Sequence, residues 1–271
     1  MTDPLTALIL GVVEGITEFL PVSSTGHLLI AQQWLPRQSD LFNVVIQAGA
    51  VLAVIPLFHH RFHQFIFNWR EKAVRDYFLK IVAAFVITGA GGYMLEKHGF
   101  KLPEKLLPVA IALFTGGVLF LVVERWLAKT GRSQGRGELA DVTWTLAVAV
   151  GLGQLIAAAF PGASRSGTTI ILALILGLGR PLATEYSFLV SIPTMLAASG
   201  YKIFETFHHP IAGAAPENWR MVILASVIAA VVSFIAVKWL LRYVQTHTFV
   251  AFGWYRIAVG AAAFALLALG H

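Results

Sequence analysis

The sequence predicts an all-α polytopic membrane protein with six transmembrane helices and two re-entrant helical hairpins arranged as an inverted-topology repeat. The chain is 57% hydrophobic and 13% charged, whereas soluble domains are about 25% charged. Six apolar runs look able to cross a bilayer, and two more are apolar but interrupted by polar residues. A chain of this composition cannot hide its apolar surface in one water-soluble core, so residues 1–271 are interpreted as a single membrane domain.

The six apolar runs are the expected transmembrane helices. A membrane-spanning helix needs about 20 residues, and about 17 are tolerated. The first run is shorter than that and needs polar flanks to complete the crossing. The runs are Val44–Phe58, Phe78–Leu95, Leu106–Val123, Tyr186–Phe204, Met221–Leu241 and Phe249–Leu269.

The two interrupted regions, Leu5–Leu35 and Val142–Leu178, are each predicted to form two short helices around a polar elbow. Pro21 and Pro161 mark the helix breaks, because proline cannot continue a helix. Non-helical backbone survives at membrane depth only where protein or a wet cavity surrounds it. Both regions are therefore expected to be re-entrant hairpins.

The interrupted regions also resemble each other at an offset of 140 residues. Gly11 aligns with Gly151, Pro21 with Pro161 and Ser24 with Ser164, and each half continues with three spans. This predicts internal repeat halves of approximately 1–130 and 141–271. An odd number of crossings inverts the second half, and such repeats place substrate sites at their interface near the midplane.

The positive charge indicates orientation and not nucleic-acid binding. The net charge is +6, but the basic residues lie in short stretches between apolar runs and form no basic face. The loops 59–77, 125–141, 179–185 and 238–248 carry eleven lysine and arginine residues, and the loops 32–43, 96–105 and 205–220 carry five. The richer side is expected to be cytoplasmic, which leaves both termini outside.

The first elbow carries the residues of an acid–base site. Glu14 and Glu18 are four residues apart and share a helix face, and Ser24 and His27 share a face of the next helix. Carboxylate oxygens suit a divalent cation such as Mg²⁺ or Ca²⁺. We expect Glu14 and Glu18 to bind the metal, Ser24 to act as a nucleophile and His27 as a general base or acid.

The second elbow is expected to bind phosphate. Arg165 offers a permanently charged, bidentate clamp, and the N-terminus of the helix that follows favours an anion. The predicted catalytic residues of the two elbows are Glu14, Glu18, Ser24, His27 and Arg165. The predicted substrate-binding residues are Ser23, Thr25, Ser164, Ser166, Gly167 and Thr168.

Each of these residues also has a structural interpretation. Ser23, Ser24 and Thr25 are good helix caps, and Arg165 could serve only as the partner of a buried glutamate. Gln154 is interpreted as a helix–helix hydrogen bond. Ionisable groups inside a membrane are functional by default, so the carboxylate pair is the strongest signal.

At its two elbows the chain resembles the undecaprenyl-diphosphate phosphatases, also called bacitracin-resistance proteins. The matching motifs are Glu14–His27 (EGITEFLPVSSTGH) and Pro161–Thr169 (PGASRSGTT), and the similarity continues through Val44–Gly49, Glu185–Leu189 and Tyr255-Arg256. Asn43 departs from the pattern, since the family often has an acid there. That difference puts in doubt a metal-binding role for position 43 and leaves the elbows untouched.

The resemblance implies removal of the terminal phosphate of undecaprenyl diphosphate, dependence on a divalent cation, and an interdigitated inverted-repeat fold. It implies a bacterial cytoplasmic membrane protein whose site faces the outside, and hence a role in recycling the lipid carrier for cell-wall synthesis. Carried over by position, the site is Glu14, Glu18, Ser24, His27, Ser164 and Arg165. The expected partners are the polyprenyl diphosphate and the bilayer, with a homodimer left open and no nucleic acid.

The residues alone leave two alternatives to the enzyme open. A secondary transporter or lipid flippase would also use inverted repeats with hairpins, and an anion channel would also need an intramembrane anion site. Neither needs a nucleophile or a base, so Ser24 with His27 favours the enzyme. Within the enzyme, attack by Ser24 and direct attack by metal-activated water both remain open.

Overall fold

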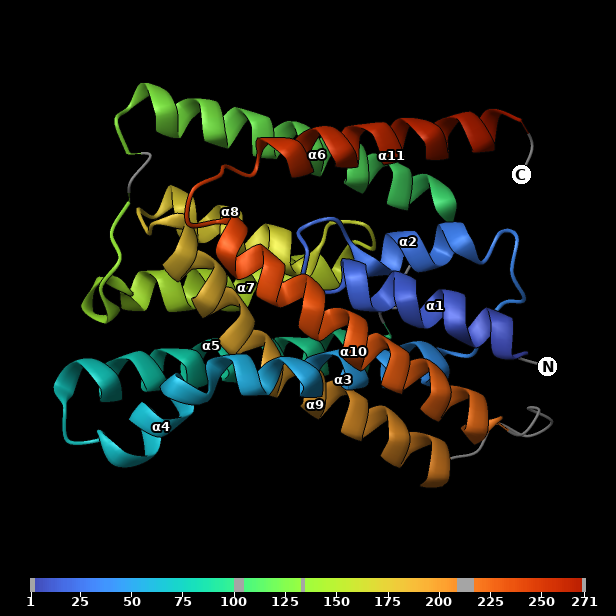
Figure 1. Ribbon diagram of the computed structural model, residues 1–271, viewed down its shortest axis with the longest axis horizontal. Coiled ribbons are helices and arrows are strands. Elements are labelled where there is room, and N and C mark those ends of the chain that lie inside the picture. The colour runs from blue at the N-terminus through green and yellow to red at the C-terminus, as the bar shows by residue number, and fades with distance from the viewer. Residues whose placement is uncertain (1–2, 100–104, 133–134, 209–216, 270–271) are drawn as a thin grey trace.

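The chain folds into helices that lie along one another in a single bundle, as the computed structural model describes for residues 3–99, 105–132, 135–208 and 217–269 (Figure 1). Six helical segments are long and apolar enough to cross a membrane, so the prediction of an all-α multi-pass membrane protein is confirmed. The segments are the Asp40–Phe67 segment, α5 (Lys72–Lys97), α6 (Leu106–Lys129), α9 (Arg180–His208), α10 (Trp219–Tyr243) and α11 (Val250–Ala268).

The first crossing segment is longer than the apolar run predicted for it. Helix α3 (Asp40–Val54) begins at the cap Ser39, whose hydroxyl accepts from the Phe42 N–H at 3.0 Å. It continues through a 3-10 turn (Ile55–Phe58) into α4 (His59–Phe67). The polar flanks are therefore helical, and part of the loop expected at 59–77 is α4. Some residues of the loops expected at 96–105 and 205–220 lie outside the described residues.

The two interrupted regions form pairs of short helices, as predicted. The first pair is α1 (Pro4–Thr17) and α2 (Ser24–Ala31), and the second is α7 (Trp144–Ala159) and α8 (Arg165–Ile175). All four helices are shorter than the roughly 20 residues of a crossing. A cap starts α1 and α7, because Asp3 accepts from the Thr6 N–H and Thr143 accepts from the Leu146 N–H. The re-entrant placement of these pairs in the bilayer stays a prediction.

The short helices occupy the middle of the molecule, between the α6–α11 pair and the helices α3, α5 and α9 (Figure 1). Helix α1 packs on α10, and α7 packs on α5. Glycines allow this approach, since a Cβ at Gly11 would lie 2.7 Å from the Ala225 carbonyl and one at Gly151 would lie 3.0 Å from the Ala84 carbonyl. Each half of the chain thus packs its first helix on a long helix of the other half. The boundaries of the repeat halves stay a prediction.

The two elbows have the same backbone shape. Ser23 (φ 76°) and Ser164 (φ 66°) are the non-glycine residues with positive φ among those described, and each caps the helix that follows it. A non-glycine residue in this region costs of order 1–3 kcal/mol, and such residues cluster at functional sites. The structure therefore aligns Ser23 with Ser164, not Ser24 with Ser164, because the second elbow has one extra residue between its proline and this serine. Ser24 and Arg165 become the equivalent residues.

Candidate active site

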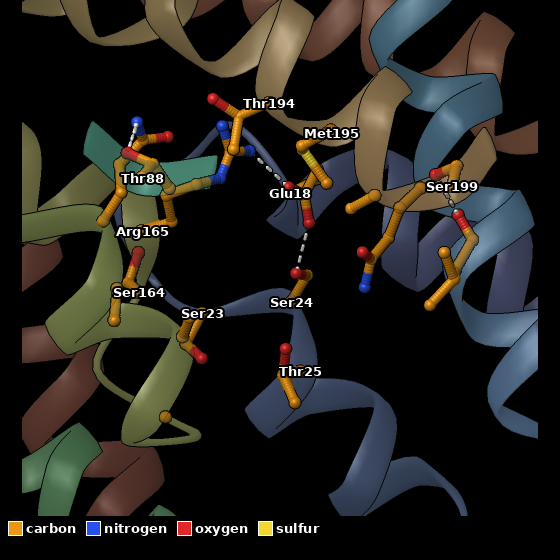
Figure 2. Close-up of a pocket in the computed structure, with 17 residues that line it drawn as sticks. Glu18, Ser23, Ser24, Thr25, Thr88, Ser164, Arg165, Thr194, Met195 and Ser199 are labelled. Atoms are coloured by element: carbon orange, nitrogen blue, oxygen red, sulfur yellow. Dashed lines mark hydrogen bonds and ion pairs between the residues drawn. The ribbon is translucent and has the colours of Figure 1, made fainter. Parts of the chain in front are cut away.

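A cavity of about 240 Å³ lies where the two elbows meet (Figure 2). Its lining comes from both elbows and from α3, α5, α7 and α9. Helices from both halves of the chain thus contribute to one site. The lining residues are Glu18, Ser23, Ser24, Thr25, Val44, Gln47, Thr88, Gln154, Ala157, Ala158, Gly162, Ser164, Arg165, Thr194, Met195, Ala198 and Ser199.

Glu18 joins the two elbows in this cavity. One carboxylate oxygen accepts a hydrogen bond from the Ser24 hydroxyl at 2.5 Å, and the other pairs with Arg165 Nη2 at 2.5 Å. Figure 2 shows these two contacts as a continuous path from Arg165 through Glu18 to Ser24. Three of the predicted catalytic residues therefore form one hydrogen-bonded chain, although Arg165 lies 147 positions from Glu18.

Arg165 retains hydrogen-bonding capacity towards the cavity. Its Nη1 atom is buried and has no hydrogen-bond partner among the described residues, while Nη2 is held by Glu18. A buried guanidinium nitrogen without an acceptor is costly. The arrangement is suited to an anion, because Glu18 fixes one edge of the guanidinium and leaves other donors free.

Glu14 lies one helical turn before Glu18. Its side chain is fully buried, and neither carboxylate oxygen has a hydrogen-bond partner within the described part of the chain. Glu14 does not line the cavity itself. An unpaired buried carboxylate requires either a proton or a cation, so Glu14 is suited to carry a proton or to help hold a cation.

The structure does not bring His27 to the Ser24 hydroxyl. The Nδ1 atom of His27 lies 2.7 Å from the Ser23 carbonyl, and Nε2 lies 2.8 Å from the Tyr255 hydroxyl. A carbonyl can only accept, so Nδ1 carries a proton, and in the neutral ring Nε2 then accepts from Tyr255. Both ring nitrogens are thus engaged, and the nearest acceptor for the proton of Ser24 is Glu18.

The remaining predicted binding residues divide into two groups. Ser23, Thr25 and Ser164 line the cavity, and Ser23 and Ser164 also accept from the backbone N–H three residues on, at Gly26 and Gly167.

Ser166, Gly167 and Thr168 do not line the cavity. The Ser166 hydroxyl donates to the Leu20 carbonyl at 3.1 Å and so ties the second elbow to the first. The Thr168 hydroxyl makes a long bond of 3.4 Å to the Ala163 carbonyl. The geometry therefore gives these three residues a supporting position.

Arg256 of α11 holds both elbows, a role that its sequence position did not reveal. It is 1% exposed, and its guanidinium donates to backbone carbonyls. The acceptors are Pro21 of the first elbow, Gly162 and Ala163 of the second, and Ala112 and Leu113 of α6. The one available signal was an arginine inside an apolar run.

Sequence reasoning also missed the wall formed by α9 and α5. Thr194, Met195 and Ser199 line the cavity from α9 beside Pro193, and Thr88 lines it from α5. A proline within an apolar run is the only trace of this wall in the sequence. Gln154 of α7 donates to the Thr88 hydroxyl at 2.9 Å, which confirms the predicted helix–helix hydrogen bond.

The chain is similar to known proteins over nearly its whole length, including both elbows. Residues 7–262 match the family described as Bacitracin resistance protein BacA. A protein of Rhizobium etli named undecaprenyl-diphosphatase is 48% identical over 269 residues, which cover 99% of this chain and 98% of the relative. A protein of Xanthomonas euvesicatoria with the same name is 49% identical over 263 residues, covering 97% and 96%. The chain therefore belongs to the bacitracin resistance protein BacA family.

Proposed function

We propose that this protein is an undecaprenyl-diphosphatase, which hydrolyses the terminal phosphate of a polyprenyl diphosphate lipid in the bacterial cytoplasmic membrane. The observation that carries the proposal is the bonded path from Ser24 through Glu18 to Arg165, which puts a nucleophile, a base and an anion clamp in one cavity. Family membership and the names of relatives nearly half identical support it. The product monophosphate would return to the lipid-carrier pool, and the activity would confer bacitracin resistance.

The proposed reaction begins with the terminal phosphate against Arg165. Ser24 Oγ attacks phosphorus, and its proton passes to the Glu18 oxygen that already accepts from it at 2.5 Å. The new Oγ–P bond replaces the bond from phosphorus to the bridging oxygen, which leaves with the prenyl monophosphate. Water then cleaves the phosphoserine and releases inorganic phosphate. Direct attack by water, with Ser24 only binding phosphate, is the alternative.

A divalent cation, Mg²⁺ or Ca²⁺, is proposed as cofactor, with Glu14 and Glu18 as its protein ligands. The unpaired buried carboxylate of Glu14 fits this role. The described residues contain no group of three or more His, Cys, Asp or Glu side chains able to hold a metal. Phosphate oxygens and water would complete the coordination, as is usual for Mg²⁺. When bound, the cation would neutralise charge on the diphosphate beside the carboxylates.

The decisive test is phosphate release by the purified protein in detergent, where no gradient exists. We expect release from a prenyl diphosphate that stops on chelation and resumes with added Mg²⁺ or Ca²⁺. Glu18→Gln, which keeps the shape of the side chain and removes its charge, should lower the rate by about 100-fold or more. A protein that binds the lipid but releases no phosphate would favour the transporter or flippase alternative.

The orientation is proposed to place the loop between α6 and α7 and the segment before α5 in the cytoplasm, with the cavity serving the outer face. Single cysteines can test it, because the chain has none. Cysteines at the exposed positions Arg70 and Gly137 should resist a membrane-impermeant thiol reagent in intact cells, and one at the exposed Asn218 should react. Rapid external labelling at Gly137 with protection at Asn218 would invert the topology.

A further inference from the structure

Gln154 presents to the cavity a buried hydrogen-bond acceptor that the proposed chemistry does not use. Its side chain is 2% exposed and lines the cavity. The amide nitrogen donates to Thr88 Oγ1 at 2.9 Å, but Oε1 has no hydrogen-bond partner among the described residues. Buried acceptors are normally satisfied, so a donor from outside this set of residues is expected at Oε1.

Thr88 fixes which end of the Gln154 amide faces the ligand. The Thr88 hydroxyl has one proton, which it gives to the backbone carbonyls of Ala84 at 2.9 Å and Gly151 at 3.1 Å. With its proton on these carbonyls, the hydroxyl faces Gln154 as an acceptor, and the amide nitrogen of Gln154 donates to it. In this arrangement the amide turns its NH₂ group to Thr88 and its oxygen away from it. While the Thr88 proton stays on these carbonyls, rotating the amide by half a turn would set two acceptors against each other.

The same cavity contains the opposite unpaired group, the buried Nη1 donor of Arg165. A ligand that satisfies both atoms must offer an acceptor to Arg165 and a proton to Gln154. A phosphoryl group with one protonated oxygen offers both. A fully deprotonated oxyanion satisfies only the arginine and places a lone pair against Oε1.

We propose that Gln154, oriented by Thr88, makes this cavity selective for a phosphoryl group that carries a proton, with Oε1 accepting from P–O–H while Arg165 binds an unprotonated oxygen. The inference rests on the proposed function, which places the terminal phosphate against Arg165. It adds a specificity-determining residue, Gln154, and a positioning residue, Thr88. An ordered water is the other source of a hydroxyl donor for Oε1, and the relative binding of phosphate and sulfate distinguishes the two sources.

Inorganic phosphate and sulfate are matched probes for this property. Both are tetrahedral oxyanions of similar size, but at neutral pH phosphate keeps at least one proton and sulfate has none. A site whose acceptor pairs with a protonated oxygen binds an anion that lacks the proton more weakly. Binding of phosphate to the full-length protein in detergent can be followed by broadening of its ³¹P resonance, and binding of sulfate by displacement of phosphate.

Gln154→Met keeps the length of the side chain and removes the acceptor. We expect phosphate affinity to fall by about tenfold, while sulfate affinity stays within about twofold of the wild-type value. The ratio of phosphate affinity to sulfate affinity should therefore become smaller than in the wild type. Equal losses for the two anions, or no change in either, would overturn the proposal, because an acceptor that binds only water or only packs would not discriminate between them.

Thr88 offers a second route that leaves Gln154 in place. Thr88→Val keeps the shape of the side chain but frees the Gln154 amide to rotate, so it should also reduce the preference for phosphate over sulfate. Thr88→Ser keeps the hydroxyl and should retain the wild-type preference. Gln47→Met is the matched control, since Gln47 lines the same cavity and no hydrogen bond holds its amide among the described residues. The Gln47→Met variant should prefer phosphate over sulfate as strongly as the wild type does. A loss of this preference as large as that in Gln154→Met would refute a specific role for Gln154.

This experiment needs no turnover, which separates the two proposals. A wild-type protein that binds phosphate but releases none from the lipid would contradict the proposed function and still report the selectivity. A protein that hydrolyses the lipid, but whose preference for phosphate is unaffected by Gln154→Met and Thr88→Val, would contradict the selectivity alone.

Discussion

Replacing Arg165 by lysine is expected to lower turnover by about 100-fold or more, nearly as much as replacing it by alanine. The reason is geometric. Arg165 uses Nη2 for Glu18 and keeps Nη1 free for phosphate, and only a planar guanidinium can hold both partners in fixed directions. A lysine ammonium keeps the charge, but its donors all leave one nitrogen and cannot reproduce the two separated directions of the guanidinium. Steady-state kinetics of phosphate release in detergent would measure the loss.

Arg180→Lys is the matched control for the Arg165 variants. Arg180 pairs with buried Glu124 through two hydrogen bonds, of 3.0 and 2.5 Å, and does not line the cavity. Its replacement should reduce thermal stability while the folded protein keeps turnover within about threefold of wild type, since the lost pair is structural. Wild-type kinetics in Arg165→Lys, or a loss in Arg180→Lys as large as in Arg165→Lys, would refute the bidentate clamp.

Ser24→Ala is expected to abolish turnover if, as proposed, Ser24 supplies the oxygen that attacks phosphorus. In rapid-quench experiments with substrate labelled in its terminal phosphate, wild-type protein should become labelled faster than one turnover, and Ser24→Ala should not. Ser23→Ala should be milder, since the Ser23 hydroxyl caps α2 through the Gly26 N–H and such caps contribute about 1 kcal/mol of stability.

The contrary outcome for Ser24 is equally clear. If wild-type protein carries no label at a time resolution faster than turnover, and Ser24→Ala retains measurable activity, then water attacks directly and Ser24 only orients the phosphate. His27→Gln separates the two candidate bases. If Glu18 accepts the proton, this variant should keep more activity than Glu18→Gln, because the ring nitrogens of His27 bond to Ser23 and Tyr255.

The sequence predicted the six spans and the two elbows because each leaves a local signal. Apolar runs identify the spans, and prolines with adjacent serines identify the breaks. The pairing of Glu18 with Arg165 has no such signal, since the residues lie 147 positions apart and meet only when the elbows pack. Helical spacing alone therefore suggested that Ser24 and His27 act as a pair within α2. In the packed structure Ser24 bonds to Glu18 instead, and His27 bonds to Ser23 and Tyr255.

The same limit explains the misaligned repeat and the missing wall of the cavity. Matching Ser24 with Ser164 assumed that both elbows have equal length, whereas the backbone shape aligns Ser23 with Ser164. Thr88 and Thr194 lie within apolar helices, where threonine usually bonds to the carbonyl four residues before. Both make that bond, and only the three-dimensional structure reveals that they also face the cavity.

The carbonyl contacts of Arg256 have a consequence for how the protein is made. This side chain belongs to α11, the last helix of the described chain, yet it bonds to Pro21 near the beginning and to Gly162 in the middle. During synthesis the two elbows can enter the membrane long before α11 leaves the ribosome, but they lack this bond until α11 inserts. A chain without α11 thus carries the proposed catalytic side chains of both elbows but lacks the bonds that hold these elbows together, and the site is locked only when α11 inserts.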